Sequence, residues 1–305
     1  MSQPLILHHY ALSPFSEKIR LILGASGLPW HSLLVSPLPP RPATDPLTGG
    51  YRRIPVAQLG ADLICDSELI AEEISALAQQ PTLAPSASDR PAREFTAFAE
   101  SSLFFDAVTS VPPRRALHQL RQHLSLWDTA RFIWDRLGIA RETGRREPLA
   151  QVARRFRQRL TDIEETLQGP YLFGNQPGHP DFALYHPLWF VVNVGGEPLP
   201  PRLPRLTQWY QQMSAFGHGQ PRDIRGREAL SLAAVSQPRP LPPTALDHPD
   251  IGKSVRITPG DYARVATLGT LAGVTEQRWI LRRQTRRFDA VHVHFPRQGY
   301  HYKVA

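Results

Sequence analysis

The stretch YALSPFSEKIR, residues 10–20, joins an apolar run to a helical pattern and decides how the first part of the chain folds. The run before it, LILHH at residues 5–9, is typical of a strand, and the apolar residues at 19–23 repeat at helical spacing. Serine caps free backbone amides and proline tolerates the first turn, so residues 13–16 are expected at a helix N-terminus. An ordinary cap explains the stretch by itself. An anion or thiolate site is the functional alternative, because the helix dipole favours negative charge there.

The composition indicates a globular protein. At 305 residues, of which 41% are hydrophobic, the chain is long enough for two domains and a small third. Its single cysteine, Cys65, excludes an internal disulfide and gives no indication of export to an oxidising compartment. The sequence shows no basic-then-apolar leader and no apolar run of about 18 residues. We therefore expect a cytoplasmic protein with no membrane contact.

Positive charge is concentrated at the C-terminal end. Residues 221–305 carry 14 Lys and Arg against 7 Asp and Glu, a net charge of +7, where the whole chain has +8. Arginine supplies nearly all of it, since the chain has only three lysines. A preference for arginine this general is typical of a GC-rich genome. The high charge is therefore weak evidence for a nucleic-acid partner, and we expect none.

The first 82 residues alternate strand and helix signals. A strand-helix-strand unit is followed by two short strands, at residues 54–60 and 61–66, and by a helix with the sequence SELIAEEISALA at 67–78. The proline- and glycine-rich segment 37–53 predicts an irregular loop with at most one short turn. A mixed sheet with helices on its faces follows from this order.

The rest of the chain divides into a helical and a β-rich part. Residues 88–235 carry helical patterns, the clearest of them an apolar stripe within ARRFRQRLTDIEETL at 153–167. A proline-rich spacer at 236–250 is the best domain boundary in the sequence. Beyond it, five short β-type runs predict a small antiparallel β domain at 250–305.

A strand-turn-helix carrying S-P-F-S, an Ile-Pro-Val on a later strand, an acid-serine pair opening a helix and an all-helical region together resemble the cytosolic glutathione transferase (GST) superfamily. The resemblance covers residues 5–80 well and 88–215 more loosely. It implies an α/β thioredoxin-like N-terminal domain at 1–82 that binds glutathione and an all-α GST C-terminal-type domain at 88–235. The mostly-β extension at 250–305 is additional to the ordinary two-domain family.

The resemblance implies a serine-type enzyme. Ser13 stands where such members have the hydroxyl that hydrogen-bonds the glutathione sulfur, which makes it the expected catalytic residue, and Tyr10 is the alternative hydroxyl. Phe15, in the same S-P-F-S context, is an expected glutathione-binding residue. With serine at positions 13 and 16, no protein thiol is available for a mixed disulfide, so glutaredoxin-like activity is disfavoured. Cys65 is expected to be a small buried apolar residue.

The resemblance also assigns the rest of the glutathione site. Pro55 matches the proline that the family holds in a cis peptide. Val56 would offer its backbone N–H and C=O to the cysteinyl part, as an added strand does. Asp66 and Ser67 match the acid-serine pair that receives the γ-glutamyl end, and Arg53 stands where the family often has a basic residue near the glycine end.

In the helical region, a segment at 169–190 resembles the family's leucine-glycine turn followed by a capped helix. Asp181 fills the aspartate position of that motif. Gly178 stands where the family prefers Ser or Thr, a departure that weakens the cap and leaves the glutathione site untouched.

Two further groups of side chains admit a functional and a structural interpretation. The first is a set of aromatic residues that line an electrophile pocket or, as we expect, form plain core: Phe104, Phe105, Trp127, Phe132 and Trp134. The second is His292 and His294, which share one face of a strand with His301 nearby. Without a carboxylate or cysteine at metal spacing, we expect structural or solvent-facing histidines and no metal.

Two functional hypotheses follow. The leading one is a glutathione S-transferase-like enzyme, a homodimer as the resemblance implies, that uses glutathione as co-substrate on a small apolar electrophile. The alternative is a non-catalytic glutathione-binding or protein/nucleic-acid interaction module that uses the basic C-terminal β domain. Its candidate contacts are Arg282, Arg283, Arg286 and Arg287, near Trp279. The enzyme hypothesis predicts that removal of residues 250–305 leaves turnover largely intact.

Overall fold

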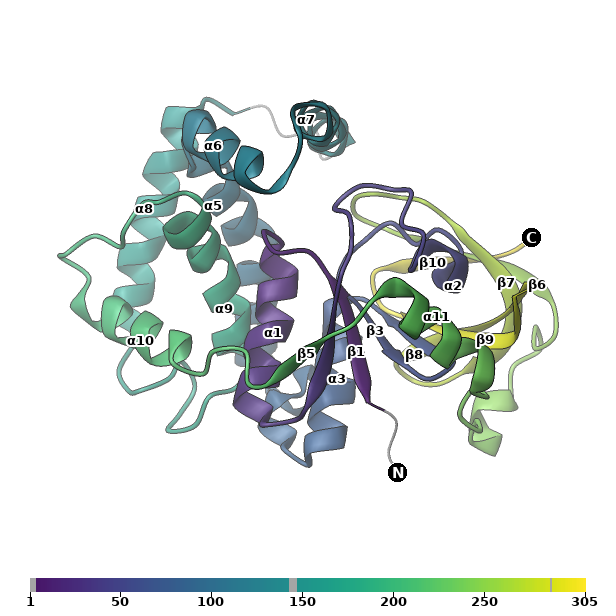
Figure 1. Cartoon of the computed structure of the whole chain (residues 1–305). Coiled ribbons are helices and arrows are strands. Elements are labelled where there is room, and N and C mark those ends of the chain that lie inside the picture. The colour runs from purple at the N-terminus through teal and green to yellow at the C-terminus, as the bar shows by residue number, and fades with distance from the viewer. Residues whose placement is uncertain (1–3, 143–146, 286) are drawn as a thin grey trace. The chain divides into compact units, whose positions relative to one another are not determined.

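The computed structural model describes residues 4–142, 147–285 and 287–305, which form two compact units (Figure 1). The sheet unit comprises residues up to 13, residues 29–70 and residues 220–305. The helical unit comprises residues 14–28 and 71–219. Each unit therefore combines segments that lie far apart in the sequence.

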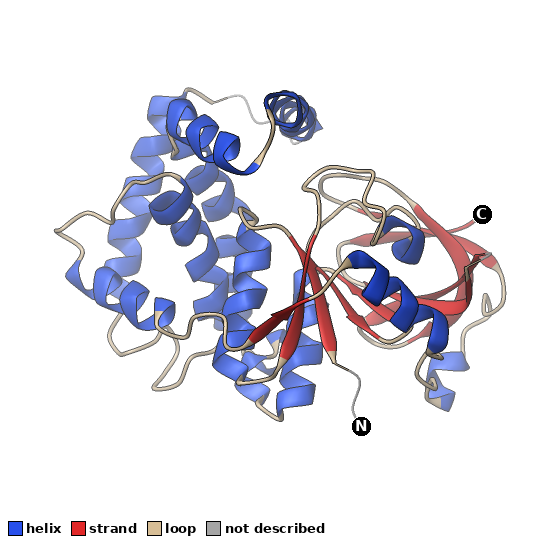
Figure 2. Ribbon diagram, viewed as in Figure 1, coloured by secondary structure: helices blue, strands red, loops and turns tan. Residues whose placement is uncertain are grey.

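The sheet unit is built on one mixed sheet (Figure 2). In the described part of the chain its strands are β1 (Leu5–His9), β2 (Trp30–Leu34), β3 (Val56–Leu59), β4 (Asp62–Cys65), β5 (Pro221–Asp223), β6 (Ser254–Pro259), β7 (Thr267–Val274), β8 (Arg278–Thr285), β9 (Phe288–Pro296) and β10 (Tyr300–Val304). They lie in the order β10-β6-β7-β8-β9-β4-β3-β1-β2-β5.

The first four strands have the thioredoxin-like arrangement that was expected. β1 is parallel to β2 and antiparallel to β3, and β3 forms a hairpin with β4. Gly60, in the two-residue turn of this hairpin, has a φ of 60°, a conformation that glycine adopts without strain. The long loop at 37–53 contains one short helix, α2 (Asp45–Thr48), which agrees with the single turn predicted for it.

The C-terminal strands continue this sheet. β6 to β9 pair antiparallel with their neighbours along the chain, β10 returns to pair with β6, and β9 pairs parallel with β4. Leu63 and Cys65 of β4 share a buried core with Val293 and Phe295 of β9. The five strands expected between 250 and 305 are therefore present, but they share both sheet and core with the N-terminal strands. Burial of common apolar surface makes the two parts fold as one.

The chain rejoins the sheet unit before the proline-rich spacer. β5 pairs parallel with β2, and α11 (Gly226–Val235) packs against β9. Ala229 of α11 lies in a buried cluster with Ile6 and Leu33, while Leu230 joins the core under the C-terminal strands. Figure 2 shows these strands curving around α2 and α11. Residues 221–235, which the helical pattern assigned to the all-helical part, thus belong with the sheet.

The helical unit contains the all-helical region. Its regular elements are α1 (Pro14–Ser26), most of α3 (Ser67–Ala78), η1 (Pro81–Leu83), η2 (Pro85–Ala87), α4 (Arg90–Phe98), the π-helical η3 (Ala99–Leu103), α5 (Phe104–Ser110), α6 (Pro113–His123), α7 (Leu126–Glu142), α8 (Leu149–Thr166), α9 (His179–Trp189), the π-helical η4 (Phe190–Val194) and α10 (Pro204–Ser214); η5 (Pro243–Leu246) lies in the sheet unit. The predicted apolar stripe of α8 is buried at Phe156, Leu160 and Ile163. Among the described residues, no helix combines the length and apolar character needed to cross a membrane.

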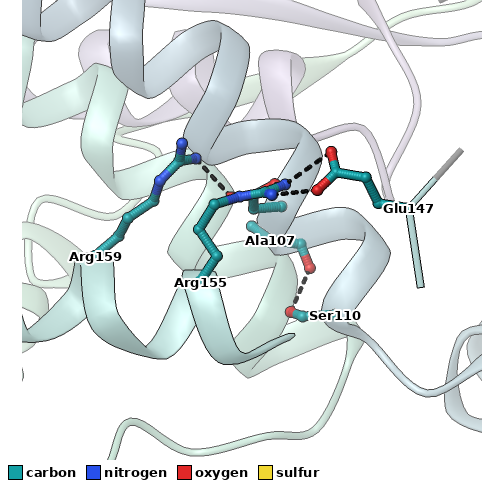
Figure 3. A network of polar contacts seen from close by, with 6 residues as sticks. Ala107, Ser110, Glu147, Arg155 and Arg159 are labelled. Atoms are coloured by element: carbon teal, nitrogen blue, oxygen red, sulfur yellow. Dashed lines mark hydrogen bonds and ion pairs between the residues drawn. The ribbon is translucent and has the colours of Figure 1, made fainter. Parts of the chain in front are cut away.

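A buried carboxylate fastens α5 to α8 (Figure 3). Asp106, 2% exposed, accepts from Arg155 at 2.6 and 2.8 Å and from Arg159 at 2.6 Å. Arg155 also binds Glu147, before the start of α8. The two guanidinium groups balance the charges of Asp106 and Glu147 and supply directional bonds.

Asp181 organises the start of α9 as the family motif implies. Its Oδ2 accepts from the Gly178 N–H at 3.0 Å, and its Oδ1 accepts from the Leu172 N–H at 3.0 Å and from Trp209 Nε1 at 2.8 Å. Gly178 has no side chain to complete the cap. The aspartate therefore provides the capping contact that remains and ties the turn to α10.

Candidate functional site

Three segments selected from the sequence meet at one edge of the sheet. β3 runs antiparallel to both of its neighbours, so its first residue lies beside the ends of β1 and β4. Ser13 follows β1, Pro55 directly precedes β3, and Asp66 directly follows β4. The strand directions thus bring a hydroxyl, a proline turn and a carboxylate to a common edge.

Ser13 lies in the tight turn that leaves β1. It is buried, and its N–H donates to the C=O of Tyr10 at 3.2 Å. Pro14, the next residue, is the first of the 13-residue helix α1. The hydroxyl therefore lies at a helix N-terminus. A hydroxyl donor and the helix dipole both favour negative charge on an atom bound at this position. Tyr10 is half-buried in the same turn, so the two hydroxyl candidates lie close in the chain and in the fold.

The peptide between Ile54 and Pro55 is cis. Val56, which follows, lies in the ladder between β1 and β4. Leu59 and Asp62 are the pair that closes the two-residue hairpin, so the backbone N–H and C=O of Leu59 point toward β4. These groups point alternately to the two neighbouring strands along β3. Those of Val56 therefore point toward β1, with which Val56 pairs. Ile54 precedes the ladder, on the other side of the cis peptide.

Asp66 and Ser67 form the junction of β4 and α3. Asp66 has a φ of 79°, in the left-handed region that aspartate adopts more readily than most residues. Its Oδ1 accepts from the Glu68 N–H at 3.1 Å, and its C=O accepts from the Ile70 N–H at 3.1 Å. Ser67 is the first residue of α3. A carboxylate beside a helix N-terminus complements a head group that carries both an ammonium and a carboxylate.

Arg53 is held by the turn between β6 and β7. Its guanidinium donates to the Asp261 carboxylate and, at 2.5 Å, to the C=O of Tyr262. The Tyr262 ring covers the guanidinium at 4.1 Å, and Nη1 lies 3.9 Å from Asp66 Oδ2. The C-terminal strands thus hold the guanidinium beside Asp66, the residue expected at the γ-glutamyl end, whereas the resemblance implies a place near the glycine end.

Phe15 and the aromatic candidates belong to the helical unit. Phe15 packs against Phe104, with 4.9 Å between ring centroids, and against His186, with 4.7 Å. Phe104 also contacts Phe105 at 5.4 Å, and Phe132 is half-buried. The two tryptophans differ from the expected plain core, because they lie on the solvent face of α7: Trp127 is 73% exposed and Trp134 is 72% exposed.

Cys65 is fully buried in β4, as expected. Burial, and secondarily the neighbouring Asp66 charge, raises the pKa of its thiol well above the usual value. A thiol that stays protonated in an apolar environment is a poor nucleophile. Cys65 therefore acts as core.

A carboxylate does accompany the two histidines of β9. Asp62 Oδ1 lies 2.8 Å from His294 Nε2, and its Oδ2 accepts from the Arg239 N–H at 2.9 Å. Potential ligand atoms of Asp62, His292 and His294 all lie within 4.8 Å of one another. The sequence concealed this carboxylate because it lies 232 residues from His294 and reaches it only through the pairing of β4 with β9. Arg239 Nε, 3.4 Å from Asp62, balances the charge, so these contacts account for Asp62 as a buried ion pair.

The arginine cluster of the C-terminal strands is partly structural. Arg283 donates to the carbonyls of residues 46 and 47 at 3.1 and 3.0 Å, at the end of α2. Trp279 stacks on a tyrosine ring of β10 at 4.5 Å. Arg286 lies outside the described residues. The exposed members are Arg282 and Arg287.

Two family models match the chain. The one described as "Glutathione S-transferase, N-terminal domain" matches residues 7–82, and the one described as "Glutathione S-transferase, C-terminal domain" matches residues 142–212. No curated protein matches the chain.

Solved structures similar to the chain carry related names. A GST-like protein from Pseudomonas syringae is 32% identical, with 99% of this chain and 100% of that chain covered and a TM-score of 0.80. A glutathione S-transferase from Rhodospirillum rubrum F11 is 16% identical, with 69% and 88% covered and a TM-score of 0.49. One from Pseudomonas fluorescens is 20% identical, with 69% and 94% covered and a TM-score of 0.47. The match with the Pseudomonas syringae protein includes the C-terminal strands, because it spans both chains.

Proposed function

The chain belongs to the glutathione S-transferase superfamily, and from this premise we propose that it is an enzyme that binds glutathione and uses its thiol on a small apolar electrophile. The observation that carries the proposal is the edge of the sheet at which Ser13, the turn at Ile54 and Pro55, and the pair Asp66 and Ser67 come together. The sulfur, the cysteinyl part and the γ-glutamyl end of the tripeptide then have complementary groups at that edge.

The sulfur of glutathione is assigned to Ser13. A model cysteine thiol has a pKa of roughly 8.5, so most of it is protonated at neutral pH. A hydroxyl that donates to the sulfur and the N-terminus of α1 both favour the thiolate. A fall of about two pKa units corresponds to about 2.7 kcal/mol of preferential stabilisation of the thiolate. Ser13 is a hydrogen-bond donor here and not itself the nucleophile.

The cysteinyl part and the γ-glutamyl end of glutathione are assigned to groups at the same edge. Ile54 offers its backbone groups outside the ladder, so the cysteinyl part can pair with them as an added strand, the role first assigned to Val56. The γ-glutamyl ammonium is assigned to Asp66, and its carboxylate to Ser67 and the N-terminus of α3.

The chemical step is nucleophilic. The thiolate sulfur forms a bond to an electrophilic carbon, and either a leaving group departs with its electron pair or, in an addition, the adjacent atom takes up a proton from water. More thiolate at working pH gives faster attack.

The proposal includes a cytoplasmic homodimer, as the family resemblance implies. Sedimentation equilibrium of the full chain measures the assembly directly. A mass of twice the 34.3 kDa chain supports the dimer, and a monomer at micromolar concentration contradicts it.

Glutathione binding tests the proposed function. Isothermal titration should give saturable binding to the wild type and weakening by about tenfold in Ser67→Ala, which loses a hydroxyl at the helix start. Ser231→Ala is the matched control, because this serine is exposed on α11. No binding by the wild type at millimolar glutathione would remove the proposal.

A further inference from the structure

Each oxygen of the Asp66 carboxylate accepts a hydrogen bond from another part of the sheet unit. Oδ1 accepts from the backbone N–H of Glu68, and Oδ2 accepts from the hydroxyl of Tyr300 at 2.9 Å. Tyr300 comes from β10, the last strand of the chain, 234 residues away. The ordinary two-domain members that the chain resembles have no such strand, so nothing in the assigned glutathione site accounts for this contact.

A second tyrosine extends this hydrogen bond into a chain in which each donor and acceptor can be assigned. The hydroxyls of Tyr51 and Tyr300 lie 2.7 Å apart. Because Tyr300 gives its only hydroxyl proton to Asp66, its oxygen must accept from Tyr51, which makes a chain from Tyr51 through Tyr300 to the carboxylate. Tyr51 is fully buried, so the chain begins in the core. Hydrogen bonds in series strengthen one another in a low dielectric.

Arg53 completes the support. Its guanidinium, held by Asp261 and by the carbonyl of Tyr262, stays 3.9 Å from Asp66 Oδ2 and lies 5.7 Å from the centroid of the Tyr300 ring. The side of Asp66 that faces the C-terminal strands is therefore occupied. Each carboxylate oxygen retains a second acceptor position, and the Asp66 side chain is 20% exposed.

We propose that Tyr300 is a positioning residue of the γ-glutamyl subsite, which holds the Asp66 carboxylate in the orientation that accepts the ammonium of glutathione. The proposal rests on the proposed function. It makes the C-terminal strands part of the site and selects ligands with an α-ammonium head group.

The shared core makes the C-terminal strands inseparable from the site. Leu63 and Cys65 of β4 pack in one cluster with Phe295 of β9, and Tyr300 packs on the same cluster, its ring centroid 6.1 Å from that of Phe295. Removal of residues 250–305 would expose this core, so loss of turnover in a truncated chain would reflect misfolding. The shared core therefore argues against the expectation that truncation leaves turnover largely intact, and point variants in the full chain are the sharper test.

The experiment compares two ligands on three full-length proteins. The ligands are glutathione and an analogue in which hydrogen replaces the γ-glutamyl amino group. The proteins are the wild type, Tyr300→Phe, and Tyr302→Phe as the matched control, because Tyr302 lies on the same strand and donates to a different carboxylate, Asp250, at 2.7 Å. Isothermal titration gives each dissociation constant.

We expect Tyr300→Phe to weaken glutathione by about tenfold, as for one hydrogen bond to a charged group, while its affinity for the analogue equals that of the wild type. Tyr302→Phe should bind both ligands as the wild type does. Tyr51→Phe, which removes only the supporting donor, should weaken glutathione by a smaller factor and serves if Tyr300→Phe folds poorly.

Three results would overturn the inference. Equal glutathione affinity in Tyr300→Phe and the wild type removes the positioning role. Equal weakening of both ligands assigns Tyr300 a general structural role. Absence of glutathione binding by the wild type removes the proposed function and the inference with it, and this outcome is distinct from the other two because it appears before any variant is made.

Discussion

Acid should destabilise the sheet unit through His8. This residue is buried in β1, with Nδ1 2.9 Å from Thr44 Oγ1 and Nε2 2.9 Å from Gln58 Oε1. The Gln58 amide nitrogen donates to the carbonyls of Gly60 and Ala229, both at 2.9 Å, so its oxygen is left to accept. The network therefore assigns the His8 proton to Nε2, while Nδ1 accepts from Thr44. These contacts suit a neutral imidazole.

The size of the effect follows from proton linkage. Burial lowers the pKa of His8 from 6.5 to about 4, although the hydrogen bond from its ring to Gln58 opposes this. Between these two values the unfolded chain binds a proton that the folded chain does not, so stability falls as the pH falls through 6.5 toward 4. The loss from this one group is about 2.5 kcal/mol at pH 4.5 relative to pH 7.5.

The assay compares wild type with His8→Gln. Pulse-labelling hydrogen exchange across a urea series, read on peptides from β1 and β3, gives the free energy of unfolding of the sheet unit at each pH. The variant should be less stable at pH 7.5 but lose about 2.5 kcal/mol less on acidification. His301→Gln, at an exposed position on β10, should keep the full wild-type loss. An identical acid loss in His8→Gln and wild type would refute the reasoning.

Three further outcomes are expected. Ser13→Ala should raise the pKa of bound glutathione by about one unit and slow conjugation about tenfold below that pKa, with little change in affinity; an unchanged pH–rate profile would transfer the role to another hydroxyl. Asp106→Asn should lower the stability of the helical unit by about 2–3 kcal/mol in urea unfolding, because Arg155 and Arg159 lose their buried counter-charge; an unchanged midpoint contradicts this. Cys65, whose pKa is raised by burial, should resist a disulfide reagent in the native protein and react after unfolding, and fast native reaction would show that β4 opens.

Local patterns predicted the N-terminal elements well. The strand at Leu5–His9 and the helix at Ser67–Ala78 have the expected bounds, because apolar periodicity and the serine at the helix start are local signals. The order of these elements predicted a mixed sheet with helices on its faces, and the family resemblance implied its thioredoxin-like arrangement. The candidate residues Ser13, Pro55 and Asp66 share one sheet edge because β3 is antiparallel to β4, as the hairpin requires, and also to β1.

Contacts made over long sequence separations were not predictable in the same way. The pairing of β4 with β9 carries no local signature, so neither the continuous sheet nor the Asp62 and His294 pair could be read from the sequence. The same limit applies to Tyr300, whose hydroxyl meets Asp66 only after the whole C-terminal part has folded. The helical pattern at 226–235 identified a helix and not the unit to which it belongs.

The pKa of enzyme-bound glutathione tests the central claim most directly. Ultraviolet difference spectra of the complex, recorded against pH with the S-methyl derivative as blank, report the fraction of thiolate. The account predicts that the pKa of the bound thiol lies about two units below that of free glutathione in the wild type. In Ser13→Ala the difference should be about one unit. A bound thiol that titrates like the free tripeptide would contradict the claim that this site activates glutathione.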